Sequence, residues 1–433
     1  MVHGKVISLK NAIITALLLH LQFDLINGLQ NGLSRLPPMG WMSWSWFKCE
    51  IDCDRHPGNC INEDLYFQHA DRMVFDGYLS VGYNTLHIDD CWTERFRDGQ
   101  SRLLADRRRF PRGITGLVDY VHARGLKFGI YADYGTKTCG GYPGSKNFEG
   151  IDAWAFADWQ VDYLKLDGCW STISEMEIGY PLFSKYLNAS GRQIIYSCSW
   201  PAYLSVKPAI NYNRIAEVCN LWRNYPDIDN NWWSLMYIIN EYVNAQDQLI
   251  PVHGPGQWND PDMLIIGNGI TEGASRVQMS VWCIWSAPLI MSTDLRRIPA
   301  HLRAILQNRE AISIDQDPMG RMGRMVIKTS QLYYFVKPIT PVIPGSIRPR
   351  FSFAIAIVNF SNRLASRITT LAALGLTDPN GYDCFEVWSR RFVGNFRHWN
   401  AFVDPVPPQD ALLYKCTLRA PLNGGFVIRR QIL

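Results

Sequence analysis

Short apolar segments that end in a polar residue or a cysteine recur along most of the chain. Eight such segments can be counted, and the residues between most of them have helical periodicity, as in 114–124, which Gly125 ends, and in 232–244. Eight strands that alternate with helices predict a (β/α)8 barrel, the TIM barrel. The predicted strands are 40–44, 85–91, 127–133, 161–169, 193–198, 217–223, 258–264 and 288–295.

The pattern changes after residues 315–320. From residue 326 onward, apolar and polar residues alternate in short pieces broken by turns, which is typical of antiparallel strands. This part predicts a C-terminal antiparallel β-sandwich of about 110 residues. The chain is therefore divided into a signal peptide at 1–30, a catalytic barrel at 31–322 and a sandwich at 323–433. Strands of the sandwich are predicted at 332–336, 351–358, 386–388 and 425–428.

The strand predicted at 161–169 is the centre of the barrel pattern. Side chains alternate between the faces of a strand, so Lys165 and Asp167 share one face while Leu164 and Leu166 share the other. The leucines can pack against outer helices, and the lysine and aspartate can point together into a pocket at the carboxyl end of the strand. The alternative is a buried structural ion pair.

The other predicted strands also end in polar or aromatic side chains, which should converge at one end of the barrel. Carboxylates accept hydrogen bonds from hydroxyl groups, and a tryptophan face packs on the apolar side of a sugar ring. Two carboxylates about 5–5.5 Å apart would permit glycoside hydrolysis with retention. No metal-binding or phosphate-binding motif accompanies them, so no cofactor is expected. The candidate residues are Trp44, Asp89, Asp90, Tyr131, Asp133, Lys165, Asp167, Arg223, Asp227 and Asp262.

Charge and the N-terminus narrow the class of protein. The chain has 43 lysines and arginines against 39 acidic residues, which gives a net charge of +4. The sequence contains no run of basic residues, so nucleic acid is not an expected partner. Lys5 and Lys10 precede an apolar run at 12–19 that polar residues then interrupt. This run is too short to span a bilayer and indicates a secretory signal. The alternative is a first amphipathic helix.

Cysteines and glycosylation sequons also indicate export. Asn188 and Asn359 each begin a sequon. The 11 cysteines include the closely spaced Cys49, Cys53 and Cys60, which fit disulfides in an oxidising compartment better than a zinc site. Because 11 is odd, at least one thiol is free or pairs with another chain. The mature chain is therefore expected to be exported, with no membrane span.

Several motifs together resemble glycoside hydrolase family 27, the α-galactosidases and α-N-acetylgalactosaminidases. The resemblance covers roughly residues 35–320 and is weak over the last hundred residues. The motifs are Pro38-Met39-Gly40-Trp41, Ile88-Asp89-Asp90-Cys91-Trp92, Gly129-Ile130-Tyr131-Ala132-Asp133, Leu164-Lys165-Leu166-Asp167-Gly168-Cys169, Ser197-Cys198-Ser199-Trp200-Pro201, Trp222-Arg223-Asn224 and Trp258-Asn259-Asp260-Pro261-Asp262-Met263.

The resemblance implies the catalytic pair. Asp167 would be the nucleophile that forms a covalent glycosyl-enzyme, and Asp227 would be the general acid and base. The residues alone do not select Asp227 over Asp229, and the family position decides between them. Pro226 departs from the commoner family pattern directly before the acid, and it fixes its own φ.

The resemblance also implies how the sugar is held. Asp89, Asp90 and Lys165 would bind the O3, O4 and O6 hydroxyl groups. Trp44 would stack on the ring, and Tyr131 would donate a hydrogen bond to the nucleophile. Arg223 and Tyr203 would lie near the group at C2 of the sugar. Asp262 and Met263 would either contact the sugar or support the rim of the pocket. Asp133 would be a buried structural carboxylate.

Two small residues bear on the substrate. Family members that are α-galactosidases carry Glu and Leu where this chain has Ser199 and Ala202. Small side chains leave room for a 2-acetamido group, so terminal α-linked N-acetylgalactosamine on glycopeptides and glycolipids is the expected substrate, with weaker activity on α-galactose. The alternatives are an α-galactosidase and a catalytically silent carbohydrate-binding protein.

The resemblance further implies four disulfides, the assembly and a lysosomal or secreted location, and the residues themselves suggest the state of the other three cysteines. Cys283 lies in an apolar helical run and is expected to be a free core thiol, while Cys384 and Cys416 could pair within the sandwich. Relatives act as homodimers, so a homodimer is expected, and an acidic working pH is expected as well. The implied disulfides are Cys49–Cys91, Cys53–Cys60, Cys139–Cys169 and Cys198–Cys219.

Overall fold

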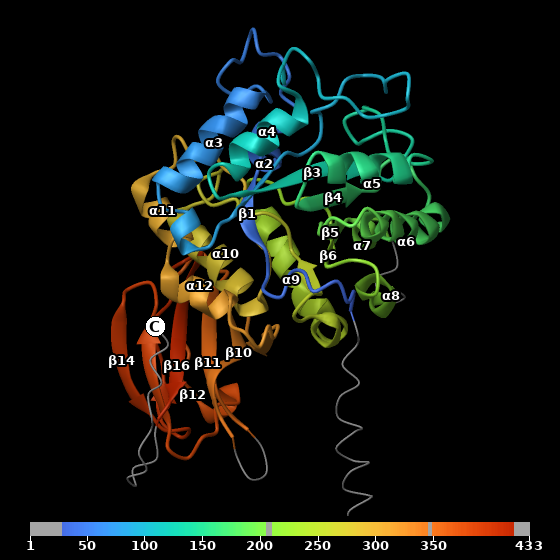
Figure 1. The fold of residues 1–433 in the computed structure, drawn as a ribbon. Helices are drawn as coiled ribbons and strands as arrows, with labels where there is room; N and C mark the ends of the chain where they lie inside the picture. Colours follow the sequence, from blue (N-terminus) through green and yellow to red (C-terminus); the bar gives the residue numbers. More distant parts are fainter. Residues whose placement is uncertain (1–27, 205–209, 345–348, 420–433) are drawn as a thin grey trace, which may run out of the picture.

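The computed structural model describes residues 28–204, 210–344 and 349–419. The predicted signal peptide at 1–30 lies outside this part except for its last three residues, and the strand predicted at 425–428 also lies outside it. Figure 1 shows the two structured regions, with the barrel in blue to yellow and the C-terminal sheet in orange to red.

The predicted (β/α)8 barrel is confirmed. Its eight parallel strands follow the order β7-β6-β5-β4-β3-β2-β1-β8. The sheet closes beyond the end of β7, where the Leu264 N–H donates to the Ile290 carbonyl at 2.7 Å and the Ser292 N–H donates to the Leu264 carbonyl at 2.9 Å. The strands are β1 (Met39–Met42), β2 (Thr85–His87), β3 (Lys127–Asp133), β4 (Tyr163–Asp167), β5 (Ile195–Cys198), β6 (Leu221–Arg223), β7 (Trp258–Asp260) and β8 (Leu289–Met291).

Helices surround this sheet, as Figure 1 shows. Side chains that accept backbone N–H groups begin several of them: Asn62 starts α3, and Thr172 forms a capping box with Glu175 at α6. The predicted helix at 114–124 corresponds to α4, and the one at 232–244 is longer in α9. The helices are α2 (Trp44–Phe47), α3 (Glu63–Phe75), α4 (Gly113–His122), α5 (Glu149–Asp158), α6 (Ile173–Ala189), α7 (Trp200–Tyr203), α8 (Tyr212–Ala216), α9 (Trp232–Leu249), α10 (Glu272–Trp285), α11 (Ala300–Leu306) and α12 (Arg309–Asp315).

The C-terminal region is antiparallel, as predicted. Its main sheet has six strands in the order β14-β13-β16-β11-β10-β9, and β12 pairs with β15 in a separate small sheet. The strand predicted at 386–388 is wrong beyond its first residue, because the Glu386 carboxylate accepts the N–H groups of Trp388 and Ser389 and so holds a turn there. The strands are β9 (Arg324–Lys328), β10 (Leu332–Ile343), β11 (Arg350–Asn359), β12 (Thr369–Thr370), β13 (Tyr382–Glu386), β14 (Arg391–Phe396), β15 (Ala401–Phe402) and β16 (Asp410–Leu418).

Both faces of the six-stranded sheet are apolar. Ala354, Ala356 and Val358 of β11 belong to the core cluster that includes the barrel, whereas Ile355 and Ile357 belong to a second cluster that covers the opposite face. This alternation follows from the two-residue period of a strand. One face of the C-terminal sheet therefore shares a hydrophobic cluster with the barrel, and the other face has a hydrophobic cluster of its own.

The two predicted glycosylation sites differ in the folded chain. Asn188 is exposed near the end of α6, so its sequon remains a prediction. Asn359 is fully buried, and its Nδ2 group donates to the carbonyls of Arg363, Val406 and Pro407 at 2.7 to 3.0 Å. This packing corrects the prediction of a glycan at Asn359, because the amide is enclosed and its N–H groups are already used. Among the described helices, none has the length and apolar character needed to cross a bilayer.

Candidate active site

A cavity of about 480 Å³ opens where the barrel strands end. It collects every predicted catalytic and binding residue except Asp133, Asp262 and Met263. A larger cavity of about 750 Å³ lies at the opposite ends of the strands, beside Lys127, Asp162 and Ile195, and contains none of them. The residues that line the first cavity are Trp44, Asp89, Asp90, Tyr131, Cys139, Lys165, Asp167, Cys169, Ser199, Ala202, Tyr203, Arg223, Tyr225, Pro226 and Asp227.

Strand β4 delivers Lys165 and Asp167 to this cavity. Leu164 and Leu166 are fully buried on its other face, as the alternation of side chains requires. Both oxygens of Asp167 accept hydrogen bonds. The Tyr203 hydroxyl and the Gly168 N–H donate to Oδ1 at 2.5 Å and 3.0 Å, and the Tyr131 hydroxyl lies 3.1 Å from Oδ2. The carboxylate is thus held in one orientation.

The Cys139–Cys169 disulfide forms part of the cavity wall next to Asp167. Cys139 Sγ lies 3.7 Å from Asp167 Oδ2, and Cys169 Sγ lies 3.3 Å from the Tyr203 hydroxyl. The family resemblance implied this bridge, but the residues predicted to line the site did not include its two cysteines. Tyr225 and Pro226 also line the cavity and were not predicted to do so. Their position directly before Asp227 in the sequence could have suggested it.

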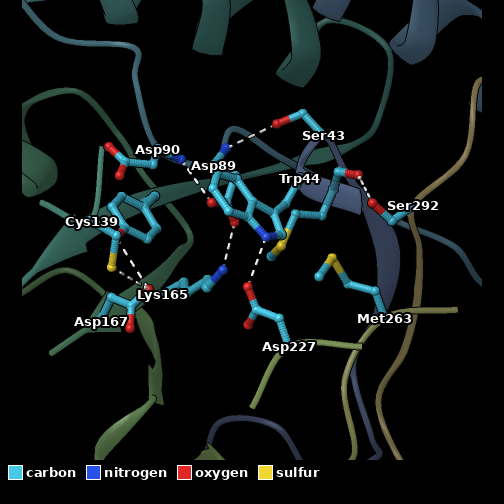
Figure 2. A network of polar contacts seen from close by, with 12 residues as sticks. Ser43, Trp44, Asp89, Asp90, Cys139, Lys165, Asp167, Asp227, Met263 and Ser292 are labelled. Atoms are coloured by element: carbon cyan, nitrogen blue, oxygen red, sulfur yellow. Dashed lines mark hydrogen bonds and ion pairs between the residues drawn. The ribbon is translucent and has the colours of Figure 1, made fainter. Parts of the chain in front are cut away.

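Lys165 of β4 contacts the first of two aspartates, Asp89 and Asp90, that follow β2. Its Nζ donates to Asp89 Oδ2 at 2.7 Å, as Figure 2 shows. Asp90 accepts the Gly140 N–H at 2.7 Å and the Cys91 N–H at 2.6 Å. Burial raises the pKa of Asp90 to about 6, although these backbone donors act in the opposite direction. Burial also raises the pKa of Asp89, which Lys165 partly offsets.

Asp227 lies on the loop after β6, across the cavity from β4. Its side chain is half exposed, and Trp44 Nε1 donates to its Oδ2 at 2.8 Å (Figure 2). Arg223 Nη2 donates to its Oδ1 at 3.1 Å. Burial acts to raise the pKa of Asp227, but Arg223, Lys165 and the Trp44 donor outweigh it, so the pKa lies below its usual range. The free site therefore stabilises Asp227 as an anion.

Asp262 lies behind Arg223 and does not line the cavity. Its Oδ2 is 2.8 Å from Arg223 Nη2 and accepts the Ile228 N–H at 2.7 Å. Burial raises the pKa of Asp262, while Arg223 lowers it. Met263 packs in a small buried cluster with Met42 and Ile290, against which Trp44 rests. Asp262 and Met263 were predicted either to contact the sugar or to support the rim of the pocket, and these contacts favour the supporting role.

The four disulfides implied by the family resemblance are all present, and a fifth joins Cys384 to Cys416 across β13 and β16. Cys283 is free and buried, as expected. Cys49, Cys53 and Cys60 are all bonded, so the alternative of a zinc site built from their thiolates is wrong.

Comparison with known proteins agrees with this geometry. A family model described as alpha galactosidase A matches residues 36–317. The chain is 46% identical to the alpha-N-acetylgalactosaminidase of Gallus gallus over 394 residues, which is 89% of this chain and 94% of that protein. It is 43% identical to the alpha-galactosidase A of Homo sapiens over 350 residues, which is 80% of each chain.

The fold is shared with solved structures. The crystal structure of alpha-galactosidase I from Mortierella vinacea matches with a TM-score of 0.79 and 28% identity, covering 89% of this chain and 98% of that chain. The human alpha-N-acetylgalactosaminidase is 47% identical over 392 residues, which is 89% of this chain and 93% of that protein. The chain described above therefore belongs to the alpha galactosidase A family, glycoside hydrolase family 27, and is a glycoside hydrolase.

Proposed function

We propose that this hydrolase removes terminal α-linked N-acetylgalactosamine with retention of configuration. The observation that carries the substrate assignment is the small volume of Ser199 and Ala202 in the cavity wall. Both lie at or within α7, next to Tyr203, which contacts Asp167. A wall of small side chains admits a 2-acetamido group, whereas large side chains at the same positions would exclude it. The relatives named alpha-N-acetylgalactosaminidase support the same substrate.

In the first chemical step, Asp167 attacks the anomeric carbon and Asp227 gives a proton to the leaving oxygen. The bond from carbon to the leaving oxygen breaks as the bond to the Asp167 carboxylate forms. In the second step, Asp227 takes a proton from water, the water oxygen bonds to the anomeric carbon, and Asp167 is released. Asp89, Asp90 and Lys165 hold sugar hydroxyl groups through both steps.

The free site is suited to the second step, because Arg223 and Trp44 stabilise Asp227 as the base. The first step requires a protonated Asp227. A bound sugar that takes hydrogen bonds from Arg223 removes part of this stabilisation, so the substrate itself raises the affinity of Asp227 for a proton.

We also propose that the protein acts in a lysosomal or secreted compartment, where the pairing of ten cysteines in disulfides is favoured. Glycopeptides and glycolipids are the proposed natural substrates, and a homodimer is the proposed assembly. Size-exclusion chromatography with light scattering tests the dimer directly.

The first experiment compares kcat/KM for chromogenic α-N-acetylgalactosaminide and α-galactoside substrates between pH 4 and 5. A preference for the N-acetylgalactosaminide supports the proposal. A preference for the galactoside would leave the mechanism in place and favour the α-galactosidase alternative. Hydrolysis of neither substrate would favour the silent carbohydrate-binding alternative.

A further inference from the structure

Asp133, the last residue of β3, is fully buried beside the proposed nucleophile and is not used by the mechanism above. Its Oδ2 lies 3.3 Å from the Tyr131 hydroxyl, 3.2 Å from the Cys169 N–H and 3.5 Å from Cys139 Sγ. Its Oδ1 has no hydrogen-bond partner among the described residues. In register, Asp133 is the direct neighbour of Asp167 on β4. The carboxyl group is therefore enclosed, weakly solvated and next to another acid.

The ionisable side chains that interact with Asp133 are carboxyl groups and tyrosine hydroxyls. Asp167 faces it from β4 and Asp90 from the loop after β2, while Tyr180 of α6 and Tyr203 of α7 add hydroxyl groups. Lys165, the nearby cation, is paired with Asp89 instead. In the described part of the chain, no lysine, arginine or histidine makes an ion pair with Asp133. An ionised Asp133 would thus be both desolvated and repelled.

Tyr131 lies between two carboxyl groups and has only one proton to donate. Its hydroxyl is 3.1 Å from Asp167 Oδ2 and 3.3 Å from Asp133 Oδ2. If both acids were ionised, one of them would face a tyrosine oxygen with no hydrogen between, which is unfavourable for a buried charge. A proton on Asp133 removes this conflict, because Asp133 can then donate to the tyrosine oxygen.

We propose that Asp133 is a positioning residue that acts as a neutral acid, donating its carboxyl proton to Tyr131 so that Tyr131 always donates to Asp167. This inference rests on the proposed nucleophilic role of Asp167. Burial and the Asp167 charge also raise the pKa of Asp133 well above its usual range, which agrees with the geometry. The directed chain from Asp133 through Tyr131 to Asp167 holds the nucleophile's orientation and leaves Asp167 as the anion of the three groups.

Two substitutions separate this role from simple filling of space. Asp133→Asn keeps the size, the neutral state and a donor to Tyr131, although its NH2 group cannot accept the Cys169 N–H as Oδ2 does, whereas Asp133→Ala removes both interactions. Loss of orientation of a reacting group costs about 10²-fold in rate, and we expect this loss in kcat for Asp133→Ala with little change in KM. Asp133→Asn should restore part of that kcat, because it regains the donor to Tyr131 but not the acceptor for the Cys169 N–H. Equal losses in the two variants would overturn the proposal.

The acidic limb of the kcat/KM profile gives a readout that a packing role would not move. If Asp133 is neutral, Asp133→Asn changes no charge and the acidic limb stays at its wild-type pH. If Asp133 is ionised, the substitution removes a negative charge beside Asp167 and moves the limb to lower pH by about one unit or more. A shift of that kind would contradict the proposal.

Neutron diffraction from wild-type crystals at pH 7 tests the proton without any variant and without catalysis. A deuteron on the Asp133 carboxyl group, directed at the Tyr131 oxygen, is the expected result, and a bare carboxylate would overturn the inference. If the wild-type protein hydrolyses neither substrate, the proposed function fails, but the neutron map still decides the state of Asp133.

Discussion

Arg223 and Asp262 form a buried ion pair behind the cavity, with Arg223 Nη2 at 2.8 Å from Asp262 Oδ2. The same guanidinium nitrogen reaches Asp227 in the cavity at 3.1 Å. Asp262 therefore orients Arg223 from behind, while Arg223 contacts Asp227, the proposed general acid and base. This arrangement predicts that Asp262 affects substrate binding although it does not line the cavity.

Replacing Asp262 by Asn should reduce kcat/KM and stability together. Removing one partner of a buried, hydrogen-bonded pair costs about 3–5 kcal/mol, and because Arg223 keeps Asp227 as a second partner we expect a loss at or below the lower end of this range. We expect kcat/KM to fall by about 10²-fold or more, because an Arg223 side chain that Asp262 no longer orients should bind the substrate less well. Steady-state kinetics and urea unfolding at pH 5 measure the two effects. Wild-type kcat/KM in a folded Asp262→Asn variant would contradict the role given to Asp262.

Asp227 and Asp229 provide a matched pair of substitutions on one loop. Both side chains are exposed, but Asp227 lines the cavity and Asp229 does not. General acid and base catalysis contributes about 10²–10⁴-fold to a rate. We expect a loss of that size for Asp227→Asn and near wild-type kinetics for Asp229→Asn, measured with the same chromogenic substrate. If Asp229→Asn proved the more damaging variant, the acid and base would have to be reassigned.

The specificity argument predicts a change of substrate in the double variant Ser199→Glu and Ala202→Leu. Larger side chains should fill the space for the 2-acetamido group and leave the smaller hydroxyl of galactose unaffected. We expect the ratio of kcat/KM for N-acetylgalactosaminide over galactoside to fall by about 10²-fold or more, because a steric block discriminates strongly. Ser199→Ala serves as a control that keeps the open volume. An unchanged ratio in the double variant would mean that other residues set the preference.

Lys337 of β10 joins the C-terminal sheet to the barrel. It is fully buried, and its ammonium group donates to the Cys283 carbonyl at 3.0 Å, to Ser286 Oγ at 2.6 Å and to the Ile314 carbonyl. These acceptors lie at the carboxyl ends of α10 and α12. Because cations stabilise helix carboxyl ends, Lys337 fixes both helices from the second region.

Lys337→Met should therefore weaken the whole fold. Buried carbonyls that lose their donors cost about 1–3 kcal/mol each, so we expect the free energy of unfolding to fall by about 3 kcal/mol or more. Urea denaturation at pH 7 measures this change. Lys328→Met, an exposed lysine on the neighbouring β9, is the control and should have a small effect. Equal stability of the two variants would show that Lys337 does not link the regions.

Asp315 next to Lys337 makes stability depend on pH. Burial raises its pKa from 3.8 to about 8, with Lys337 acting in the opposite direction. The folded protein thus binds this proton more tightly than the unfolded chain does. The resulting stability is complete below the unfolded pKa and is lost as the pH rises toward the folded pKa, with a slope of up to about 1.4 kcal/mol per pH unit.

We therefore expect a higher Tm at pH 5 than at pH 8. Asp90, whose pKa burial raises to about 6, acts in the same direction. The Asp315→Asn variant should show a smaller pH dependence of Tm, which calorimetry from pH 4 to pH 8 measures. A wild-type Tm that rises over this range would contradict the assignment of Asp315 as a buried neutral acid.

Local patterns were sufficient to predict the barrel and much of its site. The two-residue period of β4 places Lys165 and Asp167 on one face, because the alternation is a property of the extended backbone itself. The polar ends of β2, β3 and β6 predicted which side chains would converge. The family motifs then implied the proposed catalytic pair, and they predicted four disulfides that the structure contains.

Tertiary structure alone decided the contacts between residues far apart in sequence. Tyr203 reaches Asp167 across 36 positions, and Asp262 reaches the Ile228 N–H across 34. The sequon at Asn359 looks available in the sequence, yet 47 positions later Val406 supplies a carbonyl that helps to enclose it. Periodicity determines which way a side chain points, but the group it meets depends on how separate strands and loops are brought together. That is why the sequence determined the barrel and its polar face, whereas the structure decided which residues support the site from behind.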